Sequence, residues 1–270
     1  MYRGPITRLE MDEARRKSVQ SLRPAADWAL FLDADGTILH LRDTPDSVQA
    51  SAHLLDVLEL IARRLNGAVA LVSGRSIDDL DRIFVPHKLP TAGLHGLERR
   101  DAAGHVNRFP EPHALQALRG PLNDIAGNND GVLVEDKSHA LAVHYRKAPA
   151  KAFEIRKFVE DLIRPLAHEL HVIHGKMVSE IKPKHADKGS AIRDFMNEPP
   201  FTGRVPVFIG DDTTDEDGFE YVNQLHGYAV RVGASENTAA PYSIGDVDEV
   251  IAWLESWPAS LQQQQDMIRE

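Results

Sequence analysis

Two carboxylates stand one residue apart, directly after an apolar stretch, in residues 29–36 (Ala-Leu-Phe-Leu-Asp-Ala-Asp-Gly). Side chains two residues apart in an extended chain point to the same side, so Asp33 and Asp35 can face one small volume where a strand ends. Two such carboxylates repel each other unless a cation lies between them or one of them holds a proton. Either arrangement is useful in catalysis. The alternatives are a solvated acidic turn, which Asp35-Gly36 would favour, and an EF-hand calcium loop, for which Gly36 comes too early.

A second acidic segment follows a later apolar stretch and reads Gly-Asp-Asp-Thr-Thr-Asp-Glu-Asp at 210–217. Asp211 ends a predicted strand, where it is not needed as a helix cap, so we interpret it as a candidate ligand for a hard cation. The alternative is a helix start with Thr213 or Thr214 as N-cap and acids in its first turn. We apply that alternative to Glu216 and Asp217.

A serine and a lysine occupy comparable positions. Ser73-Gly74-Arg75 follows an apolar stretch, and it lacks the Gly-x-Ser-x-Gly elbow of many serine hydrolases. Lys188, in Ala-Asp-Lys-Gly-Ser-Ala, begins a predicted helix. Taken alone, a lysine at a helix start is most simply a solvated charge, so its interpretation depends on the other three signals.

The elements that must position these residues predict an α/β fold with a Rossmann-like parallel-sheet core. Apolar residues recur at helical spacing in 54–65, an apolar strand spans 68–73, and 77–84 suits a helix. This order predicts parallel strands with right-handed crossovers and ligands at their carboxyl edge. The same texture returns after residue 183, with predicted elements at 188–196 (helix), 205–210 (strand), 219–225 (helix), 228–233 (strand) and 247–257 (helix).

Between these two halves the pattern changes to that of an inserted α+β domain. Two helices each precede a pair of alternating strands, an αββαββ unit that predicts an antiparallel sheet covered on one face. The predicted elements are a helix at 113–125, strands at 132–135 and 141–145, a helix at 149–170, and strands at 171–174 and 177–181. We therefore predict a discontinuous core, 1–110 and 184–270, with an inserted cap domain at 111–183.

The remaining segments carry weaker signals. We predict a peripheral helix or a loose arm at residues 1–27 and a third core strand at 91–96. We also predict a polar hairpin at 99–108 and a frayed end at the glutamine run, 262–265.

Composition excludes several classes of function. The 270 residues are 42% hydrophobic and 27% charged, as in ordinary globular proteins, and contain no cysteine, which excludes disulfides and thiolate metal sites. A net charge of −10 disfavours a general nucleic-acid or anionic-membrane surface. The chain shows no signal-peptide or membrane-span pattern. We expect a cytoplasmic monomer that acts on a small molecule, without nucleic-acid or membrane partners.

The four short signals together resemble the haloacid dehalogenase-like (HAD-like) phosphatases. This resemblance implies that Asp33 is a nucleophile that forms an aspartyl-phosphate, and that Asp35 protonates the leaving oxygen and then activates water. It also implies that Ser73, assisted by Gly74, bonds a phosphate oxygen and that Lys188 counters the charge of nucleophile and phosphoryl group.

The same resemblance implies Mg²⁺ as the cofactor. Its ligands would be Asp33, the backbone carbonyl of Asp35, and Asp211. Asp212 and Asp215 would lie at or just behind these ligands.

Longer segments are similar to the trehalose-6-phosphate phosphatase family: 94–99, 134–137, 144–146, 175–183 and 210–219. That resemblance implies hydrolysis of trehalose 6-phosphate to trehalose and phosphate, the last step of trehalose biosynthesis. It further implies that the cap binds sugar hydroxyls through Glu135, Lys137 and Glu180. Further substrate-binding candidates are Gly74, Arg75, His95, Arg146 and Lys176. Alternatives are another capped HAD-like sugar phosphatase, a phosphohexomutase, or a non-catalytic sugar-phosphate-binding protein.

Overall fold

The computed structural model describes residues 17–41, 48–109, 113–136, 140–175, 177–184, 187–235 and 237–262. The chain divides into unit 1, made of Met1–Asn107 and Asp187–Glu270, and unit 2, made of Arg108–Ala186. The domain boundaries expected at 110/111 and 183/184 lie close to these divisions. Most of the expected N-terminal arm, two substrate-binding candidates and most of the glutamine run lie outside the described residues: 1–16, Lys137, Lys176 and 263–265.

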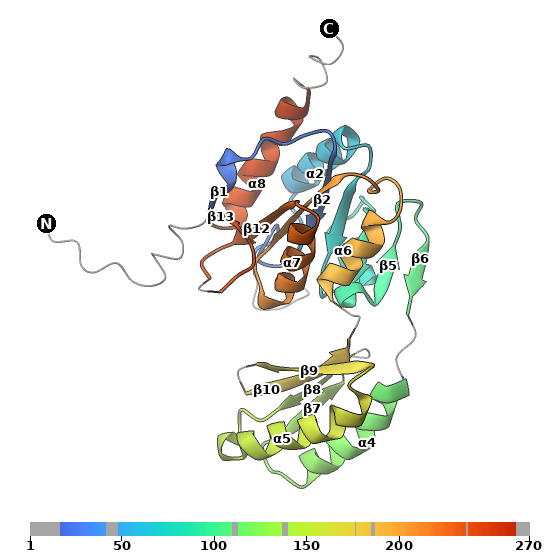
Figure 1. The fold of residues 1–270 in the computed structure, drawn as a ribbon, viewed down its shortest axis with the longest axis vertical. Coiled ribbons are helices and arrows are strands. Elements are labelled where there is room, and N and C mark those ends of the chain that lie inside the picture. Colours follow the sequence, from blue (N-terminus) through green and yellow to red (C-terminus); the bar gives the residue numbers. More distant parts are fainter. Residues whose placement is uncertain are drawn as a thin grey trace, which may run out of the picture. The chain divides into compact units, whose positions relative to one another are not determined.

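Unit 1 is built on one mostly parallel sheet. In the described ranges, nine strands pair in the order β1-β13-β12-β11-β2-β3-β4-β5-β6 (Figure 1). Neighbouring strands from β1 to β4 are parallel, and β5 runs antiparallel to β4. The strands are β1 (Lys17–Ser18), β2 (Trp28–Leu32), β3 (Val69–Val72), β4 (Thr91–Gly93), β5 (Glu98–Arg100), β6 (Val106–Arg108), β11 (Val205–Gly210), β12 (Tyr228–Val232) and β13 (Tyr242–Ile244).

Helices cover both faces of this sheet. Helix α6 packs against α7, and α2 packs against α8; Figure 1 shows the two pairs on opposite faces. The α-helices are α2 (Ala52–Arg64), α3 (Ile77–Ile83), α6 (Lys188–Met196), α7 (Glu216–Gln224) and α8 (Val247–Glu255), and the 3₁₀ turns are η1 (Val19–Ser21), η3 (Leu94–Gly96) and η6 (Thr213–Asp215). This arrangement confirms the predicted α/β fold class.

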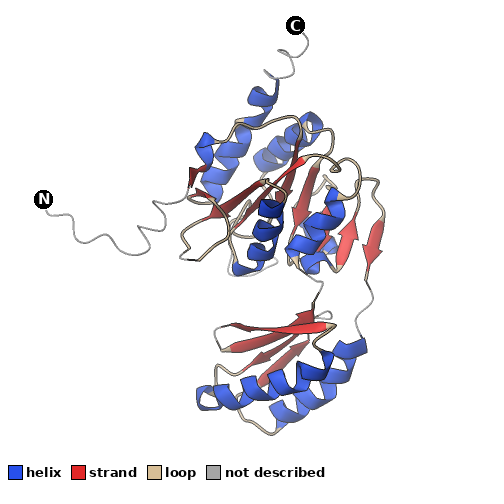
Figure 2. Ribbon diagram, viewed as in Figure 1, coloured by secondary structure: helices blue, strands red, loops and turns tan. Residues whose placement is uncertain are grey.

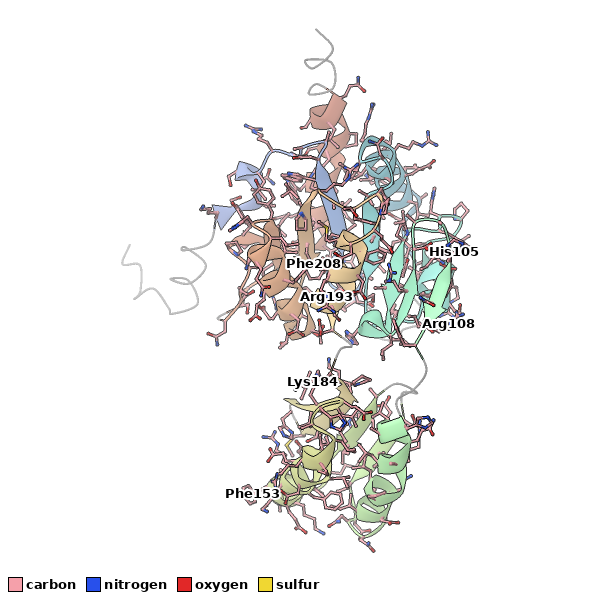
Figure 3. The ribbon with its side chains drawn as sticks, turned by 45° about the vertical axis from the view of Figure 1, so that its right-hand side comes forward. His105, Arg108, Phe153, Lys184, Arg193 and Phe208 are labelled. Carbon is pink, nitrogen blue, oxygen red and sulfur yellow. The ribbon has the colours of Figure 1, made fainter. Side chains whose placement is uncertain are left out.

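Packing on both faces fixes the strand ends that carry the site. All five residues of β2 are buried, as expected for a parallel strand covered on both sides. On one face, Phe208 of β11 lies against Phe219 of α7 with ring centroids 5.3 Å apart, and Figure 3 shows Phe208 inside unit 1. Each such buried aromatic side chain contributes about 1.5–3 kcal/mol to folding. The carboxyl ends of the strands are therefore held on a rigid frame.

In its described residues, unit 2 is a four-stranded antiparallel sheet with two α-helices on one face (Figure 2). The strands pair in the order β7-β8-β10-β9, and the order along the chain is the predicted αββαββ. The apolar sides of α4 and α5 pack on one face of the sheet and form a core separate from that of unit 1. The elements are α4 (His113–Gly127), β7 (Leu133–Asp136), β8 (Leu141–His144), η4 (Pro149–Lys151), α5 (Ala152–Ile163), η5 (Arg164–Leu166), β9 (Leu170–Gly175) and β10 (Val178–Pro183).

Several predicted elements differ from the observed ones. Residues 17–18 form an edge strand, where a peripheral helix or a loose arm was expected, and the strand β13 that pairs with it was not predicted. The strand expected over 91–96 ends at Gly93, where a 3₁₀ turn begins. The helix expected over 149–170 is α-helical only between Ala152 and Ile163, because Pro165 lacks the N–H that would continue it.

Candidate active site

Three of the predicted site residues follow neighbouring parallel strands. Asp33 follows β2, Ser73 follows β3 and Asp211 follows β11, and β2 pairs with both of the other strands. Because the carboxyl ends of parallel strands meet at one edge, these side chains come together. A cavity of about 370 Å³ lies there. It is lined by Asp33, Asp35, Leu41, Ser73, Gly74, Arg75, His95, Lys188, Asp211, Asp212 and Thr214.

Lys188 joins two deeply buried carboxylates. Its Nζ lies 2.8 Å from Oδ1 of Asp33 and 2.6 Å from Oδ1 of Asp215. The lysine side chain is only 2% exposed. It belongs to the first residue of α6, whose N-cap Asp187 accepts a hydrogen bond from the Ser190 amide. The start of the helix therefore sets the direction from which the ammonium reaches Asp33.

Burial dominates the electrostatics of this cluster. Removal from water raises the pKa of Asp33 to about 8; the charge of Asp215 adds to this effect and Lys188 opposes it. Burial alone would lower the pKa of Lys188, but the charges of Asp33 and Asp215 outweigh burial and raise it. The lysine is therefore charged, and one ammonium does not balance all the carboxylates around it. A bound cation would stabilise such a cluster.

The carboxylates are arranged to receive a cation. Oxygens of Asp33, Asp211 and Asp215 all lie within 4.8 Å of one another. Both oxygens of Asp215 already have partners, because Oδ1 accepts from Lys188 and Oδ2 accepts from the amides of Asp211 and Asp212 at 2.9 and 2.8 Å. Burial, followed by the charge of Asp215, raises the pKa of Asp211. Hard oxygen donors with excess negative charge fit a divalent cation, with Asp33 and Asp211 as ligands and Asp215 as their support.

Gly36 permits the close approach of the two acidic segments. Its φ is +75°, and a Cβ at this position would lie 2.1 Å from Oδ2 of Asp211. The next residue, Thr37, has its Oγ1 3.5 Å from Oδ2 of Asp33 and 3.4 Å from Oδ1 of Asp211. Thr37 was not among the predicted site residues, although its place directly after the acidic turn was a usable signal.

Arg75 holds the carboxylate of Asp35. Its Nε and Nη2 donate to the two oxygens of Asp35 at 2.5 and 2.7 Å, a bidentate pair that fixes the plane of the carboxylate. The Arg75 amide also donates to Oγ of Ser73 at 3.2 Å. These three predicted site residues thus form one connected group. In this structure the Arg75 guanidinium contacts the Asp35 carboxylate. Direct substrate binding by Arg75 therefore stays a prediction.

His95 lies over Gly74 in a strained turn. Leu94 and His95 have φ values of 48° and 57°, a left-handed conformation that costs a non-glycine residue about 1–2 kcal/mol. The His95 amide donates to the Ser73 carbonyl at 3.0 Å, which ties this turn to the serine loop. A Cβ at Gly74 would lie 2.8 Å from Nε2 of His95. Strain that neighbouring structure holds in place is typical of functional sites.

Asp212 caps the helical segment that follows the second acidic turn. Its side chain accepts a hydrogen bond from the Thr213 amide at 2.7 Å. The alternative in which Thr213 or Thr214 is the N-cap is therefore wrong, because η6 begins directly after Asp212. Glu216 is also more than a first-turn acid, since its carboxylate contacts Arg231 and the Ala239 amide.

Two predicted sugar-binding residues lie on one face of the unit 2 sheet. Glu135 of β7 pairs with Ala142 of β8, which pairs in turn with Glu180 of β10. The residues next to them, such as Val143, belong to the core under α4 and α5, so this row lies on the helix-free face. Nε2 of His144 lies 2.8 Å from Oε2 of Glu135. Arg146, in the turn after β8, is exposed.

The predicted site residues thus fall into two groups. The unit 1 candidates other than Asp215 line one cavity, and Asp215 bonds to Lys188. Of the described unit 2 candidates, Glu135 and Glu180 lie on their own sheet and Arg146 lies in a turn. In neither unit does the described part of the chain contain a helix long and apolar enough to cross a membrane.

Known proteins resemble this chain along most of its length. The Trehalose-phosphatase family model matches residues 31–248. A probable trehalose-phosphate phosphatase of Sinorhizobium fredii is 44% identical over 207 residues, which cover 77% of this chain and 78% of the relative. The trehalose-6-phosphate phosphatase of Escherichia coli is 39% identical over 251 residues, covering 90% and 91% of the two chains.

Solved structures of trehalose-6-phosphate phosphatases have a fold similar to that of this chain. A structure of Aspergillus fumigatus trehalose-6-phosphate phosphatase matches with a TM-score of 0.73 and 25% identity, covering 94% of this chain and 97% of that one. The fold is that of the HAD-like hydrolases. With the family model matching both halves of unit 1 and all of the insertion, the chain belongs to the trehalose-phosphatase family.

Proposed function

We propose that this protein hydrolyses trehalose 6-phosphate to trehalose and inorganic phosphate. The observation that carries the proposal is the buried Asp33 carboxylate, paired with Lys188 and close to Asp211 at the carboxyl edge of the sheet. Such a group is suited to accept a phosphoryl group once its charge is neutralised. The substrate is inferred from the relatives, whose names specify trehalose phosphate.

In the proposed first step, an Asp33 oxygen attacks phosphorus as the bond from phosphorus to the sugar oxygen breaks. Asp35 transfers a proton to the departing oxygen, so trehalose leaves as a neutral alcohol. In the second step Asp35 takes a proton from water, the water oxygen attacks phosphorus, and the bond to Asp33 breaks. Two displacements replace one very slow hydrolysis.

Other unit 1 residues would hold the phosphoryl group during both steps. The Lys188 ammonium contacts the Asp33 carboxylate and would supply a positive charge for the phosphate oxygens. The hydroxyl of Ser73 lines the same cavity and can donate to a phosphate oxygen. Gly74 leaves room for the substrate, and His95 lies beside it.

We further propose Mg²⁺ as the resident cation. Asp33, Asp211 and the backbone carbonyl of Asp35 would hold it, while Asp212 and Asp215 would support the ligand turn. When bound, the ion neutralises the negative charge shared by nucleophile and phosphate, and hard carboxylate and carbonyl oxygens are the donors it prefers.

Substrate selection is assigned to unit 2 as a cap domain. Glu135, Lys137 and Glu180 would hydrogen-bond the hydroxyls of the distal glucose, with Arg146 and Lys176 as further candidates. Two carboxylates in one row of the sheet suit a ligand that offers many hydroxyls and little apolar surface. Cytoplasmic location and the monomeric state stay predictions from the sequence.

The test measures phosphate release from trehalose 6-phosphate and from glucose 6-phosphate, with MgCl2 and with a chelator. We expect turnover of trehalose 6-phosphate on the order of 100-fold or more above that of glucose 6-phosphate, and loss of turnover with chelator. Equal rates on both substrates would favour a general sugar phosphatase. No phosphate release from either substrate would favour a binding protein.

A further inference from the structure

Arg231 contacts the main chain of the acidic turn from the neighbouring strand. It lies on β12 directly beside Gly210 of β11, the residue before Asp211. Its Nη1 donates to the backbone carbonyl of Asp212 at 2.9 Å. The arginine side chain is only 11% exposed. The side chain that contacts the Asp212 carbonyl is therefore largely shielded from water, unlike one in a surface ion pair.

The acidic turn is held from two sides. On the inner side, Oδ2 of Asp215 accepts hydrogen bonds from the amides of Asp211 and Asp212. On the other side, the carbonyl of Asp212 accepts from Arg231. Amide and carbonyl contacts at both ends of this short segment restrict its backbone, and so restrict where the Asp211 carboxylate points.

Arg231 is itself held in place by Glu216. The same Nη1 lies 3.5 Å from Oε1 of Glu216, and the other oxygen of Glu216 accepts from the Ala239 amide at 2.7 Å. This contact also offsets the positive charge of the guanidinium, which would otherwise repel a cation bound nearby. A lysine would bring a single ammonium with a different reach, so it would restore these two contacts only in part.

We propose that Arg231, anchored by Glu216, is a positioning residue that holds the Asp211–Asp212 turn in the conformation that binds a divalent cation. The proposal rests on the cation site proposed above. Neighbours that orient metal ligands typically change metal affinity about 10–100-fold when they are replaced. Arg231 belongs to this class because it contacts the backbone of the ligand turn and is not among the residues that line the cavity.

The test titrates the full chain with MgCl2 alone and follows thermal unfolding, so that the dependence of Tm on Mg²⁺ gives an apparent Kd without substrate. We expect Arg231→Gln to raise this Kd at least about tenfold, Glu216→Gln to raise it less, and Arg231→Lys to restore part of the affinity.

The matched control is Arg204→Gln. Arg204 also donates to main-chain carbonyls, those of Ala26, Trp28 and Pro200, but at the opposite end of the strands. We expect this variant to lower Tm without changing the Kd for Mg²⁺. An unchanged Kd in both Arg231→Gln and Glu216→Gln, with a wild-type chain that binds Mg²⁺, would overturn the positioning role alone. A wild-type chain whose Tm does not respond to Mg²⁺ would overturn the cation site as well.

Discussion

The carboxyl edge of the unit 1 sheet and the helix-free face of the unit 2 sheet both carry carboxylates, but they hold them differently. In unit 1, the side chains of Asp33 and Asp215 are 7% and 0% exposed and share one lysine. In unit 2, the side chains of Glu135 and its partner His144 are 49% and 39% exposed. Buried charges interact strongly and can be tuned for bond breaking, whereas exposed groups can exchange water for sugar hydroxyls at low cost.

From this contrast we expect the two units to contribute differently, unit 1 to the bond-breaking steps and unit 2 to the choice of substrate. Changes in unit 1 should affect every phosphate ester, because they alter the reacting centre. Changes on the unit 2 face should affect mainly substrates that carry the distal sugar. The predictions that follow test this division, from the largest expected effect to the smallest.

Asp33→Asn should have the largest effect. It keeps the size of the side chain but replaces the nucleophilic carboxylate with an uncharged amide, so we expect turnover of every phosphate ester to fall on the order of 10⁵-fold or more. The measurement is phosphate release with MgCl2 present. Asp194→Asn, on α6 with a side chain that is 44% exposed, is the control and should leave turnover unchanged. Full activity of Asp33→Asn would refute the nucleophile assignment.

Removal of the cation should abolish turnover. It should also make the stability of the chain depend on the protonation of the buried Asp33. Because burial raises the pKa of Asp33 to about 8, the cation-free native state keeps a proton there that the unfolded chain loses near pH 3.8. Between these values the native state binds more protons, so this group costs stability as pH rises.

A cation displaces that proton, so its stabilising effect should grow with pH. We expect MgCl2 to raise Tm more at pH 8.5 than at pH 5.5, measured in thermal melts with and without the ion. Equal gains at both pH values would contradict a cation bound to Asp33.

Gly36→Ala should damage the site beyond its backbone strain. Gly104→Ala is a matched control, because Gly104 also has a left-handed φ of +88°, but a methyl group added there would have nothing within 4 Å. Both changes cost about 1–2 kcal/mol of backbone energy. Only Gly36→Ala pushes against Asp211, so we expect turnover to fall about 100-fold in this variant and less than about twofold in the control. Equal losses of turnover would show that strain alone matters.

Glu135→Ala should discriminate between substrates. Loss of a charged hydrogen bond to a sugar hydroxyl costs about 1.5–3 kcal/mol, so kcat/KM for trehalose 6-phosphate should fall about 10–100-fold. The value for 4-nitrophenyl phosphate, which has no distal sugar, should stay nearly unchanged. Glu154→Ala, on the exposed start of α5, controls for a change of charge on unit 2. Equal losses on both esters would reject the role of the cap.

His144→Ala should have the smallest effect. Its contact with Glu135 is exposed, and such pairs contribute about 0–1 kcal/mol. We expect KM for trehalose 6-phosphate to rise at most about fivefold, with kcat unchanged. A drop in kcat on 4-nitrophenyl phosphate would show that this face takes part in the chemistry and would remove the contrast between the two units.

Periodic segments could be predicted from the sequence, whereas the short strands β1 and β13 could not. The bounds expected for the helix at 188–196 and the strand at 205–210 are the ones observed, because hydrophobic periodicity and flanking polar residues mark both ends. The two-residue β1 and the three-residue β13 carry no periodic signal. They exist because each completes the hydrogen bonds of a neighbour that is distant in the chain.

The candidate site shows the same division. Asp33, Ser73, Lys188 and Asp211 could be selected in advance, because each follows a strand or begins a helix at the edge where parallel sheets bind ligands. The partners of these residues could not be selected. These partners depend on side-chain directions across the sheet. Examples are the bond of Arg75 to Asp35, the position of Thr37 between two aspartates, and the contact of Glu216 with Arg231 beside the acidic turn.

The amino-acid sequence alone thus determined the order of elements, the insertion and the residue types that carry the chemistry, because these follow from periodicity and from spacing along the chain. Only the tertiary structure decided which carboxylates are buried, which lysine or arginine each one contacts and which side chains support them. These properties depend on distances of a few ångströms between segments far apart in sequence, and on how completely the packed core removes water from between them.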